Sequence, residues 1–301
     1  TNVAAMTALK TLQQTNKALE TTQSRISTGY KVNDAADNAA YWSIATTMRS
    51  DNKALGTVQD ALGLGSAKVD VAYTGMNAAI KVVDEIKTKL VAAREPGVDR
   101  SKVQEEITQL QNQLVSITTA AAFSGENWLS VDSGDAAYSA TKSIVASFNR
   151  SSAGTVSVST VDIDISSTEL FDAADQSGIL DTTFTTTGAG AATVSVSDLD
   201  ITAAGIDNTD IDDMISNVDG ALASMSTAAA TLGAAKSRVS IQKDFVGELM
   251  NAIDRGISTL VDADMTAEST RLQALQTQQQ LGIQALSIAN SGAQSVLSLF
   301  R

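Results

Sequence analysis

The chain carries carboxylates but neither imidazole nor thiol groups for chemistry. Its 301 residues include no histidine and no cysteine. Catalysis by serine–histidine or cysteine–histidine pairs is therefore excluded, as are zinc and iron–sulfur centres built from those ligands. The remaining candidate pair is Asp162 and Asp164, which share one face of a predicted strand. These two acids could do acid–base work, or they could be ordinary solvated acids on a surface.

A second acidic group lies in residues 207–213, with the sequence DNTDIDD. Its oxygen ligands suit calcium, but the run lacks the spaced glycine and the final glutamate of an EF-hand loop. A solvated acidic surface is the other interpretation. We expect neither a metal nor a cofactor.

Both acidic groups belong to residues 151–235, a segment with thirteen acidic residues and no lysine or arginine. The whole chain has 21 basic and 34 acidic residues, so its formal charge of −13 comes entirely from this segment. Binding to nucleic acid requires clustered lysine and arginine to neutralise phosphates. We therefore expect no nucleic-acid partner.

Long amphipathic helices flank this acidic segment. Apolar residues recur at alternating three- and four-residue steps over residues 55–93 and again over residues 103–121. This spacing is typical of packed helices. Pro96 and Gly97 interrupt the pattern, which predicts that the two helices fold back as an antiparallel pair. Asp99 offers a capping oxygen at the start of the second helix.

Both ends of the chain carry narrower apolar seams at the same spacing. The N-terminal seam is Ala5, Leu9, Leu12, Asn16, Leu19, Gln23 and Ile26. The C-terminal seam slips in register over residues 261–270 and then continues as Leu272, Leu275, Gln279, Gly282, Leu286, Ala289, Ala293, Val296 and Phe300.

Seams as thin as these cannot hold a helix in place alone. Buried apolar area contributes about 25 cal/mol per Å2, whereas ordering the backbone opposes folding by roughly 1–2 kcal/mol per residue. We therefore expect the two ends to pair with each other and with neighbouring copies of the chain. Frayed ends on a monomeric bundle are the alternative.

The middle of the chain changes to a period of two. Residues 155–165 alternate between apolar and polar, as do residues 193–197 and 199–201, which predicts strands with one buried face. The predicted fold is therefore mainly α, a long antiparallel coiled coil or helical bundle formed by the N- and C-terminal segments. A small β-rich module is inserted at the far end from the termini.

The chain contains no run of 18 apolar residues, so we expect no membrane insertion. Its first residues show no basic segment followed by an apolar one, the pattern of a cleaved signal. We expect a cytosolic protein, or one exported by a route that uses no cleaved signal.

Residues 24–40, SRISTGYKVNDAADNAA, resemble the N-terminal signature of bacterial flagellins. Residues 104–107 (QEEI) and 123–129 (FSGENWL) resemble further pieces of that family, and residues 285–301 resemble its closing segment. Residues 41–50 are similar to rhizobial and agrobacterial members of the alphaproteobacteria.

The resemblance implies a structural subunit that polymerises into the helical flagellar filament for swimming, without enzymatic activity. It implies that residues 1–38 and 262–301 form an inner coiled coil that lines the filament channel. Residues 39–130 and 214–261 would form a helical bundle. Residues 131–213 would form the surface-exposed variable module.

The resemblance also implies partners and a location. The chain would bind other copies of itself or other flagellins, and would meet the flagellar export apparatus, a chaperone, the cap and the hook-junction proteins. It would be secreted into the extracellular flagellum. A hook–filament junction protein or a secreted coiled-coil adhesin is the alternative function.

Three groups of residues follow as expected sites. Inner subunit packing is expected at Leu9, Leu12, Leu19, Ile26, Leu272, Leu275, Leu286, Val296 and Phe300. The turn between the inner and outer layers is expected to be fixed by Arg25, Asn33, Asp34 and Asp37, through capping and charge-assisted hydrogen bonds. The family's animal innate-receptor patch corresponds to a degenerate version at Glu85, Ile86, Lys89 and Leu90. Because Glu85 reverses the charge of the arginine that responsive flagellins carry, we expect poor recognition.

Overall fold

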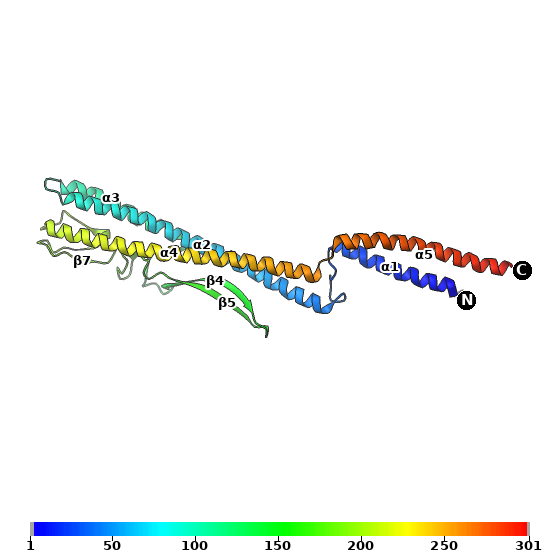
Figure 1. Cartoon of the computed structure of the whole chain (residues 1–301). Helices are drawn as coiled ribbons and strands as arrows, with labels where there is room; N and C mark the ends of the chain where they lie inside the picture. The colour runs from blue at the N-terminus through cyan, green and yellow to red at the C-terminus, as the bar shows by residue number, and fades with distance from the viewer. Residues whose placement is uncertain (1–2, 300–301) are drawn as a thin grey trace. The chain divides into compact units, whose positions relative to one another are not determined.

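The computed structural model describes residues 3–299, and the side chains of residues 3–291. Long helices occupy both ends of the described chain, and short strands occupy its middle (Figure 1). The helices are α1 (Val3–Thr28), α2 (Ala39–Ala93), α3 (Arg100–Ala120), α4 (Asn208–Val261) and α5 (Met265–Leu299). The predicted mainly helical fold with an inserted β-containing module is confirmed. None of the described helices is both long and apolar enough to cross a membrane.

The chain forms two compact units. One comprises residues 1–53 and 249–301, and the other comprises residues 54–248. The predicted division at residues 38 and 262 coincides with helix ends inside the first unit. The layer boundaries of the filament subunit therefore stay a prediction.

In the second unit α2 packs antiparallel to both α3 and α4. Lys89 Nζ lies 2.6 Å from Glu106 Oε2 of α3, and Arg94 Nε lies 2.8 Å from Asp212 Oδ1 of α4. The predicted apolar seam of α2 is buried at Leu55, Val58, Leu62, Val69, Ala72, Met76, Ala79, Val83, Ile86, Leu90 and Ala93. Asp99 caps α3 as predicted, since its Oδ1 accepts a hydrogen bond from the Ser101 backbone N–H at 3.1 Å.

The largest sheet of the middle segment is an antiparallel hairpin of β4 (Thr141–Arg150) and β5 (Val156–Asp164). Arg238 and Gln242 of α4 donate hydrogen bonds to backbone carbonyls of the hairpin. Val161 and Ile163 are buried, as the alternation predicts, but Val156 and Val158 are exposed. Ser159 and Thr160 are both polar and shift the alternation by one residue. Val156 and Val158 therefore lie on the opposite face of β5 from Val161 and Ile163.

Ile144 of the hairpin sits directly over Gly65 of α2. A Cβ atom at Gly65 would lie 2.5 Å from Ile144 Cγ2, which is closer than atoms can pack. Because Ile144 is buried, it has little space to move aside. The absence of a side chain at Gly65 therefore lets the hairpin lie against α2.

The strand prediction for residues 193–201 is mostly wrong. Only Thr193–Val194 (β8) pairs, with Phe184–Thr185 (β7), and a 3-10 turn follows at Val196–Asp198. Ser197 Oγ donates to Asp181 Oδ1, so local polar bonds replace sheet bonds. Gln104 of α3 donates to the carbonyl of Leu199. The apolar residues of this segment are thus buried without forming a sheet.

The remaining strands are short pairs. β1 (Ala122–Phe123) pairs antiparallel with β2 (Glu126–Asn127), and β3 (Ser130–Val131) pairs parallel with β6 (Phe171–Asp172). The predicted module at residues 131–213 overlaps helix α4, which already begins at Asn208.

The acids of residues 207–213 bind backbone groups around the start of α4. Asp207 Oδ1 accepts from the N–H groups of Thr209 and Asp210 at 2.8 and 3.0 Å, which caps the helix. Asp210 Oδ2 accepts from the N–H groups of Asp207 and Gly190 at 2.9 and 3.0 Å. The Asp207 N–H bond and the other hydrogen bonds lower the pKa of Asp210 to about 2. These carboxylates therefore fasten a loop to α4, and in the described part of the chain no acidic cluster has the arrangement of a metal site.

Two acids of the middle segment have raised pKa values. Burial raises the pKa of Glu169 and of Asp181. Tyr138 Oη donates to Glu169 Oε1 at 2.5 Å, and this bond raises the pKa of Tyr138 to about 12. Asp172 is also buried, but the N–H groups of Ser133 and Ala174 hold its pKa well below the usual range against the effect of burial.

We expect Gly65→Ala to destabilise the second unit by about 1–3 kcal/mol, because the new methyl group collides with Ile144. Gly63→Ala is the matched control in the same helix, since a Cβ there meets nothing within 4 Å. Alanine at that position should add up to about 1 kcal/mol of helix stability. Guanidinium unfolding followed by Trp128 fluorescence in a Trp42→Phe background measures both effects. Equal stabilities for the two variants would refute the proposed fit.

The raised pKa of Glu169 predicts a pH dependence of stability. A carboxyl group with a higher pKa in the folded chain adds stability that is present below its unfolded pKa of about 4.3, and loses it as pH rises through the folded value. The contribution of Glu169 to the free energy of unfolding should therefore fall as the pH rises from about 4 through the folded pKa. Glu169→Gln should reduce this dependence of the free energy of unfolding on pH. Asp162→Asn, at an exposed acid whose pKa is lowered, should leave the pH dependence above about pH 4 unchanged. A wild-type pH dependence in Glu169→Gln would contradict the assignment.

Candidate functional site

The two ends of the described chain pair as antiparallel helices α1 and α5. Asn16 Oδ1 accepts a hydrogen bond from Gln279 Nε2 at 2.8 Å. Arg25 Nη1 lies 3.1 Å from Glu268 Oε1. The predicted pairing of the chain ends with each other is therefore confirmed.

On α5 the buried stripe is the predicted one. Its described members are Leu272, Leu275, Gln279, Gly282, Leu286 and Ala289, all half-buried. Gly282 permits a close approach, because a Cβ there would lie 3.2 Å from Leu12 Cδ1 of α1.

On α1 the stripe that faces α5 differs from the predicted seam. Ala5, Leu12, Leu19 and Ile26 are half-buried as expected, but the positions between them are Ala8, Thr15 and Thr22. Leu9 was predicted for this seam and is instead 45% exposed. The stripes through Ala8 and through Leu9 both fit a heptad spacing. The small residues of the Ala8 stripe permit closer packing, which leaves the larger side chains outside.

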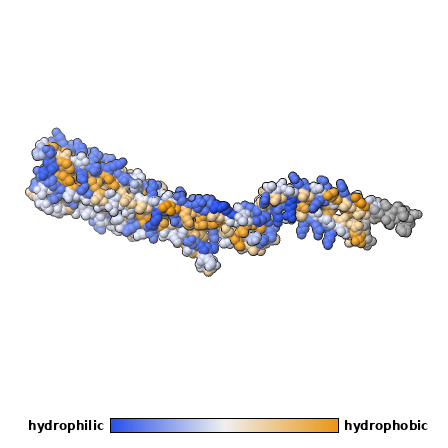
Figure 2. Space-filling view, viewed as in Figure 1, coloured by the Kyte–Doolittle hydropathy of each residue, from blue (hydrophilic) through white to orange (hydrophobic). Residues whose placement is uncertain are grey.

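Large apolar side chains accumulate on the outside of this helix pair. Because Leu12 lies beside Gly282 in an antiparallel pair, the first turns of α1 lie at the level of the second half of α5. We call their exposed residues the terminal apolar surface, part of which is visible in Figure 2. Its described members are Val3 (72% exposed), Met6 (58%), Leu9 (45%), Leu281 (58%), Ile283 (54%) and Ile288 (71%).

Leu281 and Ile283 are two residues apart and therefore lie on different sides of α5. Exposed apolar side chains of this kind mark surfaces that other molecules cover. The seam beneath adds little stability, since the buried residues of α1 are only the threonines Thr15 and Thr22. Of the other predicted packing residues, the side chain of Val296 and the whole of Phe300 lie outside the described residues.

The register slip predicted over residues 261–270 is a break between two helices. The N–H groups of Lys31 and Val32 donate to the Val261 carbonyl at 2.8 and 3.3 Å, and the Ala263 N–H donates to the Gly29 carbonyl at 2.8 Å. Gly29 has a φ of +77°, which favours glycine. The turn that follows α1 is thus hydrogen-bonded to the break between α4 and α5.

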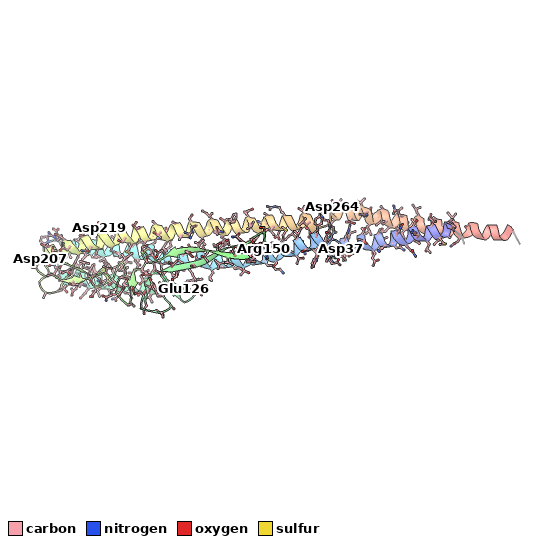
Figure 3. The ribbon with its side chains drawn as sticks, turned by 90° about the horizontal axis from the view of Figure 1, so that it is seen from below. Asp37, Glu126, Arg150, Asp207, Asp219 and Asp264 are labelled. Atoms are coloured by element: carbon pink, nitrogen blue, oxygen red, sulfur yellow. The ribbon has the colours of Figure 1, made fainter. Side chains whose placement is uncertain are left out.

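Acidic side chains and amides fix both segments at this break (Figure 3). Asp37 Oδ2 accepts from the Asn33 N–H at 2.9 Å, and Asp34 Oδ1 accepts from the Ala36 N–H at 2.8 Å. Asn38 caps α2 and Asp264 caps α5 through backbone N–H groups. The apolar spacing gives no sign of Asn38, Asp264 and Glu268, although an Asn or Asp directly before a helical pattern is a recognised start signal.

The innate-receptor residues of α2 are not all on the surface. Ile86 and Leu90 are fully buried in the helical seam. Only Glu85 is exposed, and Lys89 is half-buried beside Glu106. The predicted set of four therefore cannot act as one surface patch.

Asp162 and Asp164 do not form an acid–base site. Both are exposed on the same face of β5. The Ser143 hydroxyl lowers the pKa of Asp162, and hydrogen bonds from Ser166 lower the pKa of Asp164. Two carboxylates that are both charged at neutral pH provide no general acid.

Comparison with known proteins agrees with the helical ends. Residues 1–133 match the bacterial flagellin N-terminal helical region, and residues 215–300 match the bacterial flagellin C-terminal helical region. Flagellin C of Rhizobium meliloti (strain 1021) is 53% identical over 317 residues, which cover 100% of this chain and 98% of the relative. Flagellin A of the same strain is 46% identical, with 100% and 99% covered. A flagellin of Brucella melitensis biotype 1 is 46% identical, with 100% and 98% covered. The chain therefore belongs to the bacterial flagellin family.

Proposed function

We propose that this flagellin polymerises into the flagellar filament by burying its terminal apolar surface between copies. The supporting observation is the set of six large apolar side chains, 45–72% exposed, on a helix pair with a weak seam. Covering such a side chain fully stabilises by about 1.5–3 kcal/mol. Neighbouring copies can therefore supply the stability that the helix pair lacks alone.

The geometry of contact decides the form of the assembly. A contact between two different surfaces of the same chain repeats without closing unless the rotation happens to form a ring. Repeated contacts of this kind produce a helical tube. The chain is accordingly a structural subunit of the filament used for swimming, and its flagellin relatives give no support to a junction protein or an adhesin.

The charge distribution supports a division into inner and outer layers. Residues 1–53 and 249–301 contain nine basic and eight acidic residues, whereas residues 54–248 contain twelve basic and twenty-six acidic residues. Copies of the nearly neutral unit can pack closely without repulsion, but copies of the acidic unit repel. We therefore place residues 1–38 and 262–301 at the channel and residues 131–213 in solvent. Residues 39–130 and 214–261 form the bundle between them.

The turn residues have a role in this arrangement. Arg25 pairs with Glu268 at the end of the helix pair, while Asp34 and Asp37 shape the following turn. We propose that these contacts set where the inner helices end.

We further propose that the chain has no catalytic activity and is exported through the flagellar export apparatus. A chaperone, the cap and the hook-junction proteins would be its partners on the way. It would then reside in the extracellular flagellum.

The double variant Leu281→Ser, Ile288→Ser should slow seeded filament growth by at least about tenfold, because each lost contact is worth over 1 kcal/mol and 1.4 kcal/mol is a factor of ten. Light scattering after addition of filament fragments, with electron microscopy of the products, measures this growth. Circular dichroism checks that helix content is unchanged.

Ile241→Ser is the matched control, since Ile241 is 67% exposed on α4 in the other unit. We expect it to slow growth far less. If the double variant grew at the wild-type rate, the terminal apolar surface would not be part of the contact between copies, and the proposal would be contradicted.

A further inference from the structure

We propose that Met6 is an oxidation site at which a peroxide stops the chain from joining a filament. The proposal rests on the assembly role of the terminal apolar surface, of which Met6 is part. Among the six described members of that surface, Met6 alone has a sulfur that a peroxide can oxidise.

Met6 is the most accessible of the methionines. The chain has seven, and Met76, Met214 and Met225 are 0% exposed. Met48 and Met250 are half-buried. Met6 is 58% exposed and Met265 is 45% exposed. Because oxidation of methionine follows the exposure of its sulfur, a mild dose of peroxide should modify these two residues first.

Met6 lies outside the seam that holds α1 to α5. Its neighbours in that seam are Ala5 and Ala8, which are half-buried. Its exposed companions on α1 are Val3 and Leu9. Oxidation of Met6 should therefore leave the helix pair intact and change only the outer surface.

The reaction adds one oxygen atom to the sulfur. Hydrogen peroxide transfers an oxygen to the thioether, the sulfur is oxidised by two electrons to the sulfoxide, and the peroxide is reduced to water. The product is polar and accepts hydrogen bonds. Between apolar side chains of neighbouring copies it would find no donor, and an unsatisfied buried polar group is unfavourable.

Met265 has a different position. It is the first residue of α5, beside the helix break, and it is not part of the terminal apolar surface. Its oxidation should affect assembly less than that of Met6, because it lies at the helix break and apart from the six residues of the terminal apolar surface. Met6 is thus the proposed oxidation site, and Met265 is the control within the same chain.

The test compares Met265→Leu, in which Met6 stays oxidisable, with Met6→Leu, in which Met265 stays oxidisable. Each variant is treated with hydrogen peroxide as a free subunit, and its seeded growth is compared with that of its own untreated sample. Peroxide should slow growth of Met265→Leu by about tenfold or more, the equivalent of about 1.4 kcal/mol. Growth of Met6→Leu should change by less than about twofold. Methionine sulfoxide reductases with a dithiol should restore growth of Met265→Leu, since they return the sulfoxide to the thioether.

Peptide mass spectrometry provides a second measurement that does not depend on growth. In the free wild-type chain the Met6 peptide should oxidise faster than the Met76 peptide, and in filaments it should be protected. Unchanged growth of oxidised Met265→Leu, or equal oxidation of Met6 in free chains and filaments, would overturn the proposal. Failure of the untreated wild-type chain to grow from seeds would instead contradict the proposed function.

Discussion

The narrow seam between α1 and α5 is the constraint on which the structure depends. Helices that meet through Ala8, Thr15 and Thr22 on one side and Gly282 on the other can approach closely, but they bury little apolar area. Their larger residues then remain outside, at Met6 and Leu281 for example. Coupling of folding to assembly follows from this, because the missing burial can come only from other molecules.

The second unit and the junction near residue 262 both allow the terminal helices to depend on neighbouring copies. The second unit has its own core, in which α2, α3 and α4 bury a continuous seam, so it can stay folded while the chain ends exchange partners. The break near residue 262 and the turn after Gly29 are joined by backbone hydrogen bonds. This junction separates a helix pair that needs neighbours from helices that do not. The excess of acids in the second unit also disfavours close contact between its copies.

The regular helices could be predicted from the sequence. The prediction was wrong where local polar hydrogen bonds replace a sheet, or where two stripes of one helix compete for the same partner. The seam of α2, the cap at Asp99 and the stripe of α5 follow from spacing alone, because each has one apolar face. The position of Leu9 could not be predicted, since two stripes of α1 have the same heptad spacing and only packing selects between them. Residues 193–201 alternate like a strand, but Ser197 bonds to Asp181 and removes the segment from a sheet. Likeness to other flagellins predicts a surface patch that includes Ile86 and Leu90, whereas the apolar spacing assigns both to the buried seam, where they lie.

Hydrogen–deuterium exchange of the free subunit and of the filament tests the central claim most directly. The account predicts that amides of residues 3–28 and 265–291 exchange quickly in the free subunit, whereas those of α3 and the middle of α2 exchange slowly. In the filament the terminal amides should become protected by about a hundredfold or more, which corresponds to over 2.7 kcal/mol of stabilisation by neighbours. Slow exchange of the terminal helices in the free subunit, unchanged on assembly, would show that the seam suffices alone and would contradict the account.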